Sequence, residues 1–183
     1  MSDPDTVAAR RFAAEAEDAF RFLHDELDFL GPSVEYPSFP TWVTFKSWAT
    51  GVKATFDTLD RVVEVFIVKL VDGRLPPYDE TEGTHYIDVA SLASVAGRVL
   101  PADDLKLRNL SGEEFRRVLD RSAEVVKEFG DILRGDFRRF DEAIAERHAY
   151  IARLEDDYQR EHEDEKTRSL RRRFTRWFGR GRR

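Results

Sequence analysis

The sequence RVVEVFIVKLVDG, residues 61–73, is the most apolar stretch of the chain, and the arrangement of the other elements follows from it. Eight of its residues are valine, isoleucine, leucine or phenylalanine, and only Glu64 and Lys69 interrupt them with charges. β-Branched side chains favour strands, and Asp72-Gly73 is a turn signal. Because a strand that is apolar on both faces is buried on both, we predict a central strand here rather than an edge strand or a helix.

Three further strands are expected between residues 33 and 60, where apolar and polar residues alternate with the period of two that is typical of strands. Val34 and Tyr36 indicate a short first strand, which nearby prolines mark as peripheral. Residues 42–48 and 52–56 follow. Short connections join antiparallel neighbours, so these strands and the central one are predicted to form a four-stranded antiparallel meander.

Helices are expected on both sides of the meander. The apolar residues of the first thirty positions recur with helical spacing, and Gly31-Pro32 is expected to end this N-terminal helix. Asp88 can cap a short helix over residues 89–99. Ser111 and Glu114 form a capping box at the start of a third helix.

The third helix is predicted to be long, because its apolar stripe continues to Tyr158 with an average step near 3.6 residues. Gly130 and Gly135 interrupt the sequence but not the phase of the stripe, so we favour one continuous helix. The alternative is a break at Gly135, with Asp136 capping a new helix. A helix over residues 112–158 would be roughly 70 Å long, so part of it would project, pack along the N-terminal helix, or pair with another chain in a homo-oligomer.

The predicted fold class is therefore α+β, a four-stranded antiparallel meander packed with an N-terminal helix and a long C-terminal helix. We expect a single α+β domain over residues 1–158, which includes most of the long helix. Residues 159–183 are expected to form a charged helical extension with a basic amphipathic tail.

The composition indicates a cytosolic, bacterial protein. The chain has no cysteine, no apolar run long enough to span a membrane and no cationic and apolar leader at its start. Arginine outnumbers lysine 24 to 6, as in GC-rich bacterial genomes. Residues 166–183 contain nine basic and no acidic residues, so this segment carries +9 and the preceding 165 residues carry −15 in a chain whose net charge is −6.

The cationic tail has the pattern of a helix that lies on anionic membranes, with four large apolar residues at positions i, i+4, i+7 and i+8 and arginines between them. We expect it to bind an anionic membrane surface, which would place the protein at the inner face of the membrane, or else nucleic acid. The alternatives are that it folds back on the acidic body or stays solvated. The candidate binding residues are Arg168, Leu170, Arg171, Arg172, Arg173, Phe174, Arg176, Trp177 and Phe178.

Two tryptophans, Trp42 and Trp48, are candidates for protein binding. Both point to one side of the predicted strand 42–48, together with Thr44 and Lys46. If that side is open, they form an exposed aromatic patch suited to protein recognition. The alternative is that the N-terminal helix covers this side and buries both.

No residue pattern indicates catalysis. The loop with Asp79, Glu80, Glu82, His85 and Asp88 could hold a divalent metal or do acid–base chemistry, but we favour a solvated acidic loop in which Asp88 caps a helix. The chain has no phosphate-binding loop, nucleophile elbow or dinucleotide fingerprint. A histidine on the stripe of the long helix, His148, fits a core or interface position. We therefore predict no enzyme activity, no cofactor and no metal.

Two short motifs, Val-Asp-Gly-Arg-Leu-Pro at residues 71–76 and Leu-Arg-Gly-Asp-Phe at residues 133–137, occur within a helix–meander–helix order. In this the chain resembles, over roughly residues 20–140, small uncharacterised bacterial proteins that are similar to immunity proteins of polymorphic toxin systems. The resemblance implies a non-enzymatic protein that binds one partner protein. An acidic body suits a basic partner such as a nuclease toxin, so we expect an immunity-like protein-binding module, with membrane or nucleic-acid association through the tail as the alternative.

Overall fold

The computed structural model describes residues 4–36, 40–77, 84–98, 100, 107 and 109–178, with side chains described as far as residue 160. The chain divides into two compact units, Met1–Ile144 and Ala145–Arg183. The first contains the sheet and its helices, and the second consists mainly of the larger part of helix α6 (Arg138–Phe178). The apolar stripe explains where the division falls, because Ile144 is buried whereas Ile151, Leu154 and Tyr158 are exposed.

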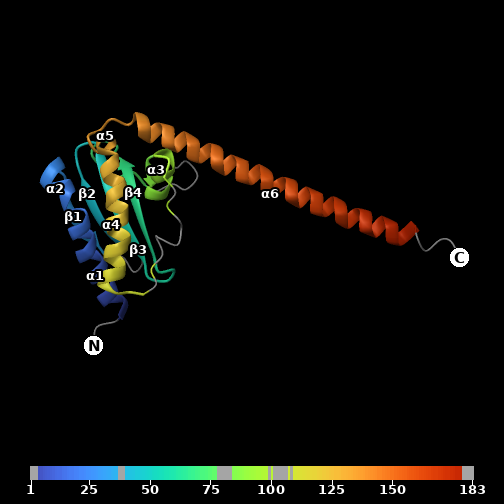
Figure 1. Ribbon diagram of the computed structural model, residues 1–183, viewed down its shortest axis with the longest axis horizontal. Coiled ribbons are helices and arrows are strands. Elements are labelled where there is room, and N and C mark those ends of the chain that lie inside the picture. The colour runs from blue at the N-terminus through green and yellow to red at the C-terminus, as the bar shows by residue number, and fades with distance from the viewer. Residues whose placement is uncertain are drawn as a thin grey trace. The chain divides into compact units, whose positions relative to one another are not determined.

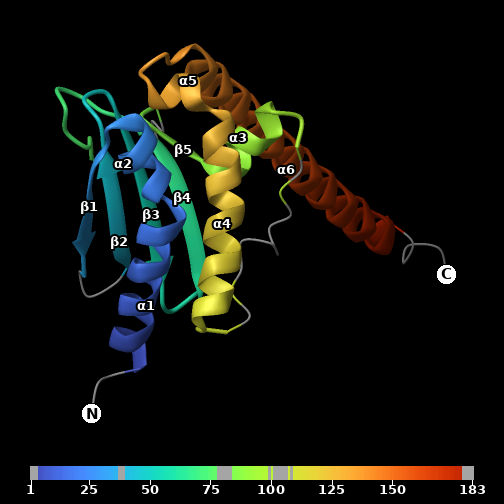
Figure 2. The ribbon, with the colours of Figure 1, turned by 60° about the vertical axis from the view of Figure 1, so that its left-hand side comes forward.

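The first unit is an α+β fold built on a five-stranded antiparallel sheet in sequence order, which confirms the predicted meander and adds one strand (Figure 2). The added strand pairs with the apolar strand 62–69. It has only three residues, which is too short for an alternating pattern to be recognised in the sequence. The strands are β1 (Leu30–Glu35), β2 (Thr41–Lys46), β3 (Thr50–Asp57), β4 (Val62–Lys69) and β5 (Tyr86–Asp88).

The apolar run of the sequence forms β4, which lies between β3 and β5 as an inner strand, as predicted. The turn signal that follows it is also confirmed. Val71 and Arg74 exchange backbone hydrogen bonds of 3.0 and 2.9 Å, and Asp72 and Gly73 both take positive φ angles, 50° and 70°. Glycine adopts such angles without steric cost, so the Asp-Gly sequence is suited to this tight turn.

The N-terminal helical region differs from the prediction of one helix ended by Gly31-Pro32. It forms α1 (Pro4–Ala19) and α2 (Arg21–Leu27), and Gly31 and Pro32 belong to β1, where a cis peptide bond joins them. The region ends earlier because Asp28 takes a left-handed conformation and its N–H donates to the carbonyl of Leu23, a common way to close a helix.

The region after residue 111 is also broken, so the prediction of one continuous helix is wrong and the alternative break at Gly135 is correct. It forms α4 (Gly112–Glu128), α5 (Gly130–Leu133) and α6. Gly135 has a φ of 91°, which no helix contains, and the carboxylate of Asp136 accepts the N–H of Arg138 at 3.2 Å at the start of α6. The apolar stripe keeps its phase through this break, which concealed it in the sequence.

The predicted N-caps Ser111 and Asp88 are confirmed. Ser111 accepts the N–H of Glu114 at 3.2 Å and begins α4, while the N–H of Ser111 itself donates to the side chain of Asn109 at 2.9 Å. Asp88 accepts the N–H of Ser91 at 2.8 Å and begins α3 (Val89–Val95). Each cap satisfies a backbone group that the first turn of a helix leaves unpaired.

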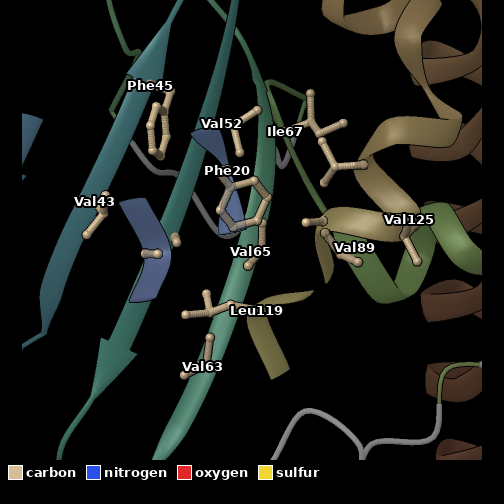
Figure 3. Packing of buried hydrophobic residues seen from close by; sticks show 14 of the residues in the cluster. Phe20, Val43, Phe45, Val52, Val63, Val65, Ile67, Val89, Leu119 and Val125 are labelled. Atoms are coloured by element: carbon tan, nitrogen blue, oxygen red, sulfur yellow. The ribbon is translucent and has the colours of Figure 1, made fainter. Parts of the chain in front are cut away.

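The hydrophobic core lies on one face of the sheet, under α1 and α4, which run side by side (Figures 1 and 2). Because side chains alternate along a strand, every second residue of β2, β3 and β4 reaches this layer. Figure 3 shows the layer with Phe20 and Leu119 over the strands. Its strand residues are Val43, Phe45, Val52, Ala54, Phe56, Val63, Val65 and Ile67.

We predict that Gly135→Ala lowers the free energy of unfolding by about 1–2 kcal/mol, because alanine is strained at a positive φ and its Cβ would lie 3.1 Å from the Trp48 ring. In a continuous helix the same substitution would stabilise the protein by about 1 kcal/mol. Urea denaturation followed by circular dichroism separates these outcomes by sign.

Gly130→Ala is the matched control. Gly130 lies within α5, and an added Cβ would meet only the flexible end of Arg134. This substitution should leave the unfolding free energy unchanged or raise it by up to about 1 kcal/mol. A stabilising effect of Gly135→Ala equal to that of Gly130→Ala would contradict the break in the helix.

Candidate protein-binding face

The second face of the sheet carries no helix among the described residues of the first unit, since α1, α3 and α4 all pack on the core side (Figure 2). Part of this second face is nevertheless covered. Leu70 and Leu75, in the segment after β4, pack against Phe66, Val68 and Tyr86 in a small second cluster. The Tyr86 hydroxyl donates a hydrogen bond of 2.7 Å to the carbonyl of Pro76, which holds the segment after β4 against the sheet.

Among the described residues, the part of this face that the cluster leaves uncovered includes a row of side chains that crosses four strands. The strand register places Glu35 beside Trp42, Trp42 beside Thr55, and Thr55 beside Glu64. With strands about 4.8 Å apart, the row is about 14 Å long. Lys53 lies two residues before Thr55 on the same face of β3. We call these five residues the open face: Glu35, Trp42, Lys53, Thr55 and Glu64.

Lys53 and Trp42 form the centre of the open face. The Lys53 ammonium lies 3.7 Å from the centre of the Trp42 ring, a favourable cation–π geometry. Burial against these neighbours lowers the pKa of Lys53, and the negative charge of Glu35 opposes part of that effect. The contact holds the half-buried indole against the sheet, so Trp42 is presented as a fixed apolar surface rather than as a mobile side chain.

Glu64 gives the open face a negative charge that no described ion pair balances. Burial raises the pKa of its carboxyl group, and the nearby carboxylates of Asp88 and Asp57 raise it further. Those two carboxylates are held by local backbone contacts: Asp88 caps α3, and Asp57 accepts the N–H of Leu59 at 2.7 Å. Three acidic groups are therefore fixed near one another, which disfavours the charged form of Glu64.

The two tryptophans predicted for protein binding do not form one patch. Trp42 belongs to the open face, whereas Trp48 lies beyond the end of β2, is 77% exposed and contacts the turn at Gly135. The alternative in which the N-terminal helix buries both is wrong, because α1 packs on the opposite face. Trp42 lies within β2, whereas Trp48 lies in the bend that follows the last residue of β2, Lys46.

The remaining candidate residues lie elsewhere. The helical backbone of α6 continues to Phe178, so residues 166–178 are helical as expected, but the side chains proposed for membrane or nucleic-acid binding lie outside the described ones. Asp79, Glu80 and Glu82 also lie outside the described residues. His85 is half-buried and His148 is exposed. Within the described part of the chain, no group of three histidine or acidic residues could hold a metal ion, and no helix is long and apolar enough to cross a membrane.

Lys53, Glu35 and Glu64 are additions that the sequence reasoning did not single out. A signal for one of them was present, since Glu64 interrupts the apolar run of β4 at a position whose neighbours on both sides point to the core. The partners of Glu64 on the other strands could be identified only from the register.

Comparison of the chain with family models, with curated proteins and with solved structures finds no match.

We predict that Glu64→Gln makes the fold more stable than the wild type at pH 7. The raised pKa means that the folded state binds the Glu64 proton more tightly than the unfolded state, so this contribution is present below the ordinary pKa of 4.5 and is lost as the pH rises through the folded value. The advantage of the glutamine variant should accordingly shrink as the pH falls toward 4.5. Urea denaturation of both proteins at a series of pH values measures the difference between their free energies of unfolding.

Glu17→Gln, which removes an exposed carboxylate from α1, is the control for the loss of one negative charge. A Glu64→Gln variant that is less stable than the wild type at pH 7 would show that the carboxylate has a stabilising partner, contrary to this description.

Proposed function

We propose that the chain is a non-enzymatic protein-binding module that binds a cationic surface of a partner protein through the open face. The observation that carries the proposal is the row from Glu35 to Glu64, in which a half-buried tryptophan lies between two acidic side chains and no described ion pair balances the charge of Glu64. The proposal includes a cytosolic location, in keeping with the composition.

The aromatic part of the row supports the binding of a protein. Tryptophan is among the residues that contribute most to protein interfaces, because it buries a large apolar surface at a small entropic cost. Lys53 already restricts the Trp42 ring in the free protein, so this side chain loses little further conformational entropy when a partner binds. The row lies on strands whose other face forms the core, which makes it a rigid platform.

The charge of the row supports a cationic partner. A lysine or arginine placed against Glu64 would relieve the repulsion from Asp57 and Asp88 and would stabilise the charged carboxylate. Residues 1–144 contain 28 acidic and 18 basic residues, so the whole unit attracts a basic protein over a distance. The nucleic-acid-binding surface of a nuclease toxin has this basic chemistry, since it must contact phosphates. An immunity-like role is thus the specific form of the proposal.

The test uses a photo-crosslinking amino acid at Thr55, between Trp42 and Glu64, in the cells that make the protein. We expect one crosslinked partner with a basic surface. In this background Trp42→Ala should reduce the crosslinked product at least about tenfold, since interface tryptophans commonly contribute more than 1–2 kcal/mol. Glu64→Lys should reduce it as well.

Trp48→Ala is the matched control, because Trp48 is an exposed tryptophan outside the open face. It should leave the yield of the product unchanged. A product that forms equally from a probe at Glu17 on α1, or that persists in both Trp42→Ala and Glu64→Lys, would refute binding through the open face.

A further inference from the structure

Helix α6 exposes a line of large apolar side chains after it leaves the core. Tyr150, Ile151, Leu154 and Tyr158 are between 40% and 62% exposed, and residues 148–160 are exposed all round the helix. A helix that is solvated on every side has no need of such a line for its own stability. The line therefore indicates a partner helix.

Three residues of this line, Ile151, Leu154 and Tyr158, have the spacing of a coiled-coil seam, and Arg147 extends it. Residues 147, 151, 154 and 158 follow one another at steps of four, three and four, which keeps them on one side of a helix that winds around another. Arg147 is the one charged member, and it is half-buried. We call the set Arg147, Ile151, Leu154 and Tyr158 the α6 seam.

We propose that the α6 seam pairs with the α6 seam of a second copy of this chain, in antiparallel orientation. In this arrangement each of the four seam residues lies opposite the seam residue whose number brings the sum to 305. Ile151 then packs against Leu154 of the second copy, and Arg147 lies against the ring of Tyr158. The pairing is isologous, so each of these contacts occurs twice.

The position of Arg147 sets the orientation. A parallel pair would place the two Arg147 side chains against each other inside the seam, which like-charge repulsion disfavours. An antiparallel pair places each guanidinium over a tyrosine ring, where it gains a cation–π contact and keeps its charged end near water. A single polar residue within a seam commonly determines register and orientation in this way.

The residues that flank the seam agree with the antiparallel pair. His148 falls beside Glu155 of the second copy, and Tyr150 falls beside Asp157, so each carboxylate meets a group that can donate a hydrogen bond to it. All of these residues belong to the second unit, so the pairing is independent of the open face.

The first test is sedimentation velocity of the full chain over a concentration series. The wild type should form dimers, and Leu154→Asp should weaken dimerisation at least about tenfold, because it places a carboxylate in the seam. Ala152→Asp, on the opposite side of the helix, should leave it unchanged. Circular dichroism should show the same helix content in all three proteins, since both positions are exposed.

The second test determines orientation and uses the absence of native cysteines. Arg147→Cys protein mixed with Tyr158→Cys protein should form a disulfide-linked heterodimer. Neither protein alone should do so, because in the antiparallel pair like positions lie eleven residues, about 16 Å, apart along the helix. Disulfides within each single variant, and none between them, would establish a parallel pair instead.

A wild type that stays monomeric at every concentration would overturn the proposal. So would a protein whose α6 seam binds vesicles containing phosphatidylglycerol, with Leu154→Asp abolishing vesicle binding and leaving the sedimentation unchanged. In that case a membrane, and not a second copy, would cover the seam.

Discussion

The packing of β4 on both of its faces is the constraint on which the rest of the structure depends. Val63, Val65 and Ile67 reach the core under α1 and α4, whereas Phe66 and Val68 reach the smaller cluster under Leu70 and Leu75. The smaller cluster covers only the end of the second face that lies near the turn at Asp72-Gly73. A strand alternates its side chains strictly, so the residues of the second face beyond that cluster must be compatible with water. The open face is the result of this partial cover.

The meander could be predicted because its strands carry a local pattern, and β4 could be placed inside the sheet because no charge breaks its run except Glu64 and Lys69. The breaks in the helices were harder to predict, and the one at Gly135 was expected only as the alternative to a continuous helix. At Gly135 the apolar phase is the same on both sides, so the stripe favoured a continuous helix, although glycine readily takes the positive φ that separates α5 from α6. At residue 28 an aspartate closes the helix where a glycine was expected three positions later.

The site shows the same division between local and long-range information. Trp42 could be found in the sequence, because it is a large aromatic residue on the side of an alternating strand that also carries Thr44 and Lys46. Its neighbours Glu35, Lys53 and Glu64 come from three other strands, and only the pairing of those strands brings them together. Trp48 shares the alternation of Trp42 in the sequence, but β2 ends at Lys46, so the chain turns away before Trp48 is reached. The open face and the α6 seam belong to separate units and differ in chemistry, since the first carries two carboxylates and the second none, which favours separate partners for them.

The central claim, that the open face presents Trp42 to solvent on a rigid sheet, can be tested by collisional quenching of tryptophan fluorescence. The chain has three tryptophans, so Trp48→Phe combined with Trp177→Phe leaves Trp42 as the only emitter. Acrylamide should quench its emission in the native protein, more weakly than in urea but clearly above the level of a core residue, and Lys53→Met should change the native quenching by removing the ammonium above the ring. A native Trp42 that acrylamide does not quench would contradict the account, because another part of the protein would then cover the face.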